Sequence, residues 1–281
     1  AQGTARRRRG RITTIRLLLP VMELGTNMPQ PVCGKASILF MTYAVCHAIL
    51  LTFQLTMNHP SSVGAIIVAV TAAALVYDNA LIGLGSWFFP RARVDRAQHA
   101  LLVLWSRPRF VLHAVLTPLL AISTCQLAEE GGVDFVQGKT GICVVFVAGA
   151  LSLLGLLHHV CHPELVLKKP HPNAPPGALS SQLVRCTVAS VQEQNNVRQK
   201  RQALVLMILP SVLVCVWSAV IGAAMTLNAT AKTAQAGRWL VITAVVELCS
   251  NAGPPWTMDL TGNFGEVVFL CGFVMAQTTL R

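Results

Sequence analysis

Five ionisable side chains lie within apolar stretches of the sequence: His47, Asp78, His113, Glu247 and Glu266. Hydrocarbon does not solvate a charge, so groups of this kind pair with one another, bind a ligand or carry protons. Depths follow from a helical rise of about 1.5 Å per residue. They place His47 near the middle of a membrane and the others toward one surface, with Glu266 close to the interface. One polar layer is expected.

The simplest chemistry for this layer is mutual neutralisation. Asp78 is expected to form an ion pair with Arg109 or a hydrogen bond with His113, assisted by Tyr77 and Asn79. A buried ion pair can fix how helices pack without adding stability. The predicted structural polar layer consists of Asp78, Arg109, Glu247 and Glu266.

Three functional alternatives compete with this structural interpretation. A neutral imidazole can bind the magnesium of a chlorophyll or the iron of a haem, which makes His47 and His113 candidate pigment ligands. His158 and His162 have the i, i+4 spacing that lets two imidazoles share a metal ion, although solvated histidines at the interface explain them as well. Asp78, Glu247 and Glu266 could instead form a proton or ion path, for which the Gly-Pro-Pro break at 253–255 is the only further sign.

No enzyme signature accompanies these residues. The sequence contains no G-x-S-x-G, no H-E-x-x-H, no Walker A motif, no C-x-x-C pair and no paired aspartates that could hold a magnesium–diphosphate. No catalytic residue is therefore assigned, and the protein is not expected to be an enzyme.

The elements that carry these groups are membrane helices. Of the 281 residues, 53% are hydrophobic and only 12% are charged, against about 25% charged in a soluble domain. This composition argues against a soluble enzyme, a disordered chain and a nucleic-acid-binding domain, despite the net charge of +11. We expect an all-α polytopic protein with about seven transmembrane helices, five long and the last two short. Their expected bounds are 36–57, 62–84, 110–127, 140–160, 203–227, 239–250 and 265–278.

The distribution of basic residues supports this topology. With side A defined as the side of the N-terminus, 18 of the 22 lysines and arginines fall on side A of the alternating spans. By the positive-inside rule, side A faces the cytoplasm, stroma or matrix.

Four regions follow from these bounds. Residues 1–35 form a basic N-terminal arm, 36–161 a four-helix membrane region, 162–202 an extramembrane loop, and 203–281 a C-terminal membrane region. Residues 178–202 space their apolar side chains in a loosely helical manner, which predicts an amphipathic helix lying on side A.

Three segments carry a resemblance to a known family: VYDNALIGLG at 76–85, RPRFVLHAVLTPLL at 107–120 and GNFGE at 262–266. The pattern Y-D-N, R-F-x-x-H-A and G-N-x-G-E resembles a poorly characterised family of multi-span membrane proteins of cyanobacteria and plastids. No activity is attached to that family. The resemblance implies a photosynthetic lineage, a thylakoid or envelope location, and a linked set of Asp78, Arg109 and His113.

The leading functional prediction is a non-catalytic integral subunit of a photosystem supercomplex in the plastid thylakoid, with its N-terminus on the stromal side. It would contact core or antenna subunits and lipids, bind no nucleic acid, and hold a few peripheral chlorophylls or carotenoids. One alternative is a transporter or lipid-modifying enzyme of the plastid envelope. The other is an accessory subunit of a respiratory complex in the mitochondrial inner membrane.

Overall fold

The computed structural model describes residues 34–58, 61–88, 96–161, 165–168, 173–176, 178–188, 197–227, 230–254 and 257–281. The basic arm predicted for residues 1–35 lies outside these ranges except for Gly34 and Lys35. The account that follows concerns the described residues alone.

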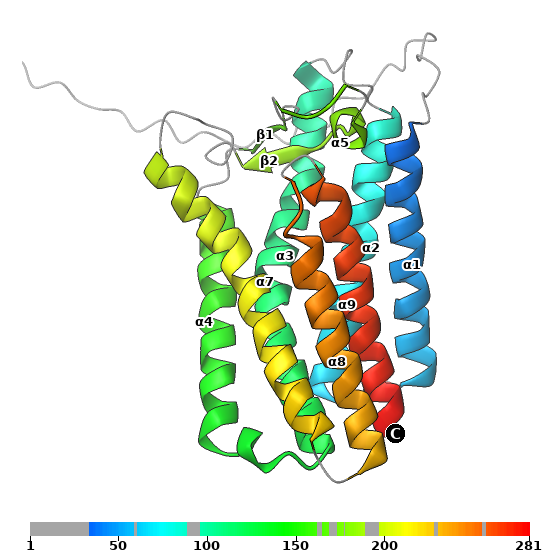
Figure 1. Cartoon of the computed structure of the whole chain (residues 1–281). Helices are drawn as coiled ribbons and strands as arrows, with labels where there is room; N and C mark the ends of the chain where they lie inside the picture. Colours follow the sequence, from blue (N-terminus) through cyan, green and yellow to red (C-terminus); the bar gives the residue numbers. More distant parts are fainter. Residues whose placement is uncertain are drawn as a thin grey trace, which may run out of the picture. The chain divides into compact units, whose positions relative to one another are not determined.

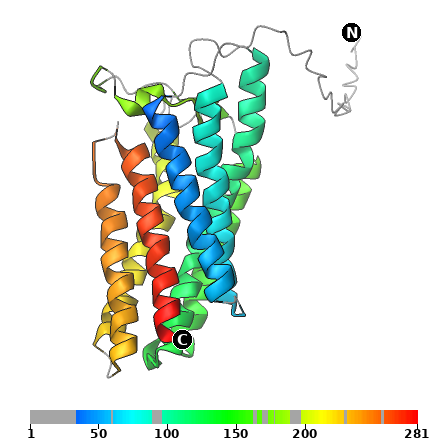
Figure 2. The same ribbon diagram turned by 90° about the vertical axis from the view of Figure 1, so that its right-hand side faces the viewer.

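Seven long helices run in alternating directions through the described chain (Figures 1 and 2). Six of them are long and apolar enough to cross a membrane. The seventh, α8, has 20 residues and packs between α7 and α9. The prediction of an all-α, polytopic membrane protein is therefore confirmed. The helices are α1 (Lys35–Met57), α2 (Val63–Phe88), α3 (Arg96–Glu130), α4 (Lys139–Cys161), α7 (Val197–Thr226), α8 (Ala231–Ser250) and α9 (Met258–Leu280).

The last two helices are longer than predicted. The expected spans, 239–250 and 265–278, capture only the most apolar parts of helices that begin eight and seven residues earlier. Polar residues hid these turns. Lys232, Gln235 and Arg238 of α8 are exposed, whereas Thr233 is buried and its hydroxyl donates to Gly131 O at 3.1 Å. A search for lipid-like composition misses a helix turn that is covered by protein.

Helix α3 also exceeds its predicted span of 110–127. It runs for 35 residues and contains Pro108 and Pro118. Because Pro118 has no backbone N–H, it cannot donate a hydrogen bond to the carbonyl oxygen of Ala114. Helix α4 packs against α3 at this point. Ser152 of α4 donates to Val115 O at 2.8 Å, and a Cβ atom on Gly155 would lie 3.0 Å from Ala114 O. Neighbouring helices support proline-containing membrane helices in this way.

The amphipathic helix predicted for 178–202 is wrong. Only α5 (Leu179–Gln182) is helical there before β2 (Cys186–Val188) pairs antiparallel with β1 (Leu165–Leu167), and α7 already begins at Val197. Val184 and Cys186 are buried while the alternate residues are partly exposed, which is the two-residue period of a strand. These short elements lie at the end of the bundle opposite the C-terminus (Figure 1).

Glycines allow α7, α8 and α9 to approach closely. A Cβ atom on Gly222 of α7 would lie 2.6 Å from the carbonyl oxygen of Gly237 of α8. On α9, a Cβ atom on Gly272 would overlap the Thr243 side chain of α8. Small residues at helix crossings let backbones pack directly in membranes. The positions of the side chains on α8 and α9 therefore depend on this close contact.

The α7–α8 crossing gives the first prediction. Gly237→Leu should destabilise the protein by about 1–3 kcal/mol, because the new side chain must displace the α7 backbone. Thermal unfolding in detergent, followed by circular dichroism, measures the change. The control is Gly149→Leu, since a Cβ atom at Gly149 meets nothing within 4 Å. Equal unfolding temperatures for the two variants would contradict the role of the crossing.

Candidate functional site

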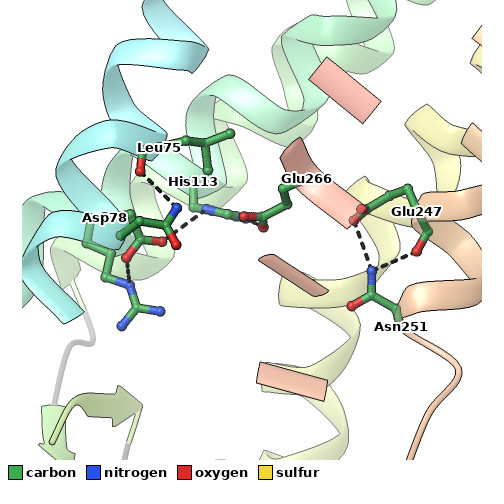
Figure 3. A network of polar contacts seen from close by, with 8 residues as sticks. Leu75, Asp78, His113, Glu247, Asn251 and Glu266 are labelled. Atoms are coloured by element: carbon green, nitrogen blue, oxygen red, sulfur yellow. Dashed lines mark hydrogen bonds and ion pairs between the residues drawn. The ribbon is translucent and has the colours of Figure 1, made fainter. Parts of the chain in front are cut away.

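Four ionisable side chains from three helices form a connected row in the described structure (Figure 3). Arg109 Nε of α3 forms an ion pair with Asp78 Oδ1 of α2. His113, one turn further along α3, has its Nδ1 4.0 Å from Asp78 Oδ2 and its Nε2 3.1 Å from Glu266 Oε1 of α9. The predicted pairing of Asp78 with Arg109 is confirmed, and His113 extends it to a third helix.

The residues on either side of Asp78 do not assist this pair as predicted. Tyr77 donates from its hydroxyl to Trp105 O at 2.6 Å, and Asn79 donates from Nδ2 to Leu75 O at 2.9 Å. Successive residues of a helix point in different directions. Tyr77 therefore ties α2 to α3 on an outer face, and the Asn79 amide bonds within its own helix.

Glu247 of α8 extends the polar group beyond Glu266. Its Oε1 accepts a hydrogen bond from Asn251 Nδ2 at 2.9 Å, and the residue is 6% exposed. The Oε2 atoms of Glu247 and Glu266 have no hydrogen-bond partner among the described residues. A Cβ atom on Gly265 would overlap Glu247 Oε2, so this carboxylate lies directly against the α9 backbone beside Glu266.

These groups line one cavity of about 50 Å³ between α2, α3, α7, α8 and α9. That space accommodates a few water molecules. Asp78, Arg109, His113, Glu247 and Glu266 all contribute to its wall, together with Thr71, Thr117, Ser211 and Cys215. The His113 side chain is 37% exposed even though it lies inside the bundle, and the cavity it lines accounts for this exposure.

Glu266 lies deeper than the sequence indicated. It was expected close to the side A interface, but α9 begins at Met258. Eight residues correspond to about 12 Å of helix, which is enough to bring the carboxylate level with His113. The predicted span began at Gly265, one residue before Glu266, whereas about two helical turns of α9 precede this glutamate.

The short β-hairpin covers the side A end of this row. Leu165, Val184 and Cys186 pack against Leu102 and Phe110 of α3. The backbone N–H of Val184 donates to Ser86 Oγ of α2 at 2.9 Å. Burial raises the pKa of the Cys186 thiol, opposed by a hydrogen bond with Ser106 and by the charge of Arg109. Cys186 is therefore close to the Arg109 end of the row.

The two candidate pigment ligands have different surroundings. His47 is fully buried, and its Nδ1 donates to Tyr43 O at 2.9 Å while its Nε2 has no partner among the described residues. Both nitrogens of His113 face carboxylates. An axial ligand needs a free nitrogen with space for a macrocycle, so neither arrangement adds support for chlorophyll, and pigment binding stays a prediction.

The candidate metal pair is only partly within the described residues, because His162 lies outside them. His159 is buried and stacks on Phe110 with ring centres 5.8 Å apart, and His158 meets His159 edge-on at 5.2 Å. Within the described part of the chain, no group of three or more His, Cys, Asp or Glu residues could hold a metal ion.

Sequence reasoning missed a set of amide side chains in the other half of the bundle. Gln54 of α1, Asn58 at the C-terminal cap of α1, and Gln277 of α9 are buried and joined by hydrogen bonds. Only ionisable groups had been considered inside the spans. Amides within apolar stretches also form contacts between membrane helices, so this signal was present.

Comparisons with known proteins add no relative. No protein-family model and no curated protein matches the chain. The resemblance to the cyanobacterial and plastid family therefore stays a prediction, and function must be argued from the site.

The ion pair gives the second prediction. Asp78→Asn leaves Arg109 buried without its counter-charge and should cost about 3–5 kcal/mol of stability. Thermal unfolding in detergent measures this loss. Asp134→Asn is the control, because Asp134 is exposed at the opposite end of the bundle. If the Asp78→Asn variant were as stable as the wild type, the expected loss of stability on breaking the ion pair would be contradicted.

Proposed function

We propose that this integral membrane protein is a transporter and that the cavity is its proton-coupling site, where protons bind and are passed on. The observation that carries the proposal is the position of His113, whose imidazole lies between the carboxylates of Asp78 and Glu266 on the cavity wall. Imidazole and carboxylate groups in series are the usual components of proton relays inside membranes. The cavity that His113 lines has room for water molecules.

Charge balance supports the proposal. With His113 protonated, Asp78 and Glu266 neutralise Arg109 and His113. An ionised Glu247 would then add an uncompensated charge in a medium where this is costly. Neutrality requires a proton on Glu247 or a cation in the cavity. Loading and unloading of one proton can therefore change the charge of the site without breaking the Asp78–Arg109 pair.

The third prediction tests the site directly. In proteoliposomes containing a pH-sensitive dye, the wild-type protein should take up protons when a pH gradient is imposed. Glu266→Gln should slow this uptake by about 10²-fold, the scale of a lost proton-transfer group. Glu129→Gln is the control, because Glu129 is exposed at the side B end of α3. Uptake that is equally fast in both variants would contradict the proposal.

We also propose, as a second candidate, the photosystem-subunit role predicted from the sequence. The surface of α4 supports this role, because only 17% of the most apolar 18-residue segment of the helix is buried inside the protein and Phe146 is 74% exposed. Such a face is available to a neighbouring membrane protein as well as to lipid. The thylakoid location, the peripheral chlorophylls and carotenoids, and the neighbouring core or antenna subunits all belong to this candidate.

The fourth prediction separates the two candidates. If the chain is a photosystem subunit, mild-detergent native gels of its source membranes should place it in a large pigmented band with reaction-centre proteins. Mass spectrometry and an absorption spectrum of that band provide the measurement. If the chain instead migrates as a small colourless species, the subunit role is contradicted and the proton-coupling site remains the proposed function.

A further inference from the structure

A second row of buried polar side chains follows the face of α1 that packs on α9. Tyr43, His47, Gln54 and Asn58 all lie on this face. His47 Nε2 has no partner among the described residues, and neither does Glu266 Oε2 across the interface. These two atoms belong to helices that pack together, so they can interact only if they lie at the same level along the bundle axis.

The hydrogen bonds between α1 and α9 define which residues of the two helices lie at the same level. The two helices run in the same direction (Figure 1), and Tyr43 Oη donates to Leu260 O at 3.2 Å, while Gln54 Nε2 donates to Gln277 Oε1 at 2.5 Å. These partners are 217 and 223 positions apart in the sequence. His47 and Glu266 are 219 positions apart, which lies between the two. The register therefore sets the imidazole of His47 level with the Glu266 carboxylate.

The tautomer of His47 suits it to accept a proton from that side. Its Nδ1–H donates to Tyr43 O at 2.9 Å, which leaves a lone pair on Nε2. The charged groups within electrostatic range of His47 are Glu266 on α9 and Asp78 on α2. Both are acidic, and their negative charge offsets part of the cost of burying an imidazolium.

We propose that His47 is the proton acceptor that follows Glu266, and that the path continues toward side B between α1 and α9. This inference rests on the proposed function of the cavity. Starting from protonated His113 paired with the Glu266 carboxylate, His113 Nε2–H gives its proton to Glu266 Oε1. The carboxyl group rotates and passes this proton to His47 Nε2, so that His47 becomes an imidazolium and Glu266 is again a carboxylate. Water in the cavity then reprotonates His113.

The route beyond His47 passes an apolar barrier. Gln54 lies seven positions beyond His47, about 10 Å along the helix, and Leu50 and Leu51 pack into the core between them. Below the barrier, Asn58 Nδ2 donates to Gln54 Oε1 at 2.7 Å, and Thr278 Oγ1 donates to Asn58 Oδ1 at 3.1 Å. Amides do not titrate at ordinary pH, but they hold water that conducts protons. Release of the proton to side B therefore requires water molecules to enter the apolar segment at Leu50 and Leu51.

The fifth prediction uses two readouts on the full chain. Proton binding is measured in detergent after a pH jump, and transmembrane flux is measured in proteoliposomes. His47→Gln should lower flux by at least about tenfold while rapid proton binding at the cavity persists. His113→Gln should lose both, because it interrupts the path at its entry. Normal flux in a folded His47→Gln protein would overturn the inference.

A second pair of variants tests the barrier independently of His47. Leu51→Ala should raise flux several-fold by admitting water, and the control Leu55→Ala should not, because Leu55 is 48% exposed on the outer face. Equal flux in these two variants would overturn the α1–α9 route. Wild-type protein that binds protons at the cavity without conducting them would overturn the inference and the proposed function together. Flux that is lost in Glu266→Gln but normal in His47→Gln would overturn this inference alone and leave the proposed function standing. The absence of rapid proton binding would overturn both.

Discussion

The burial of charge between α2 and α3 is the constraint on which the rest of the site depends. Asp78 and Arg109 lie where neither could remain ionised alone. Their pairing aligns the two helices and fixes the face of α3 that turns inward. His113 lies one turn beyond Arg109 on this face, so its imidazole reaches both Asp78 and α9. An ion pair that adds little net stability can thus determine where a titratable group lies.

The contact between α8 and α9 imposes the second condition. Because Gly265 has no side chain, the Glu247 carboxylate reaches the α9 backbone next to Glu266. A larger residue would push α8 away and separate the two acids. Packing by glycine and proton chemistry are therefore linked at one position. Asn251 then holds one oxygen of Glu247 and leaves the other toward α9.

The sequence predicted what depends on apolarity and charge alone. The spans that face lipid, the all-α class and the pairing of Asp78 with Arg109 follow from the cost of exposing polar groups to hydrocarbon. The starts of α8 and α9 did not follow, because they contain polar residues such as Thr233 and Asn263 that are buried by other helices, where hydropathy is uninformative. The hairpin was missed for a related reason: Val184 and Cys186 are buried by contact with α3. Contacts of this kind are set by the fold.

Helix α9 is the wall that the two polar rows share. On one side Glu266 accepts from His113 at the cavity, and on the other the same helix bonds to α1 through Leu260 and Gln277. Hydrogen bonds hold α9 to α1, whereas its contact with α8 passes through the glycines at 265 and 272. The Thr243 and Glu247 side chains of α8 fit against these two glycines, so the position of α9 along α8 also fixes the distance between Glu247 and Glu266. Glu266 thus keeps Glu247 on one side and the register with His47 on the other, which makes α9 the helix that connects the cavity to the α1 row.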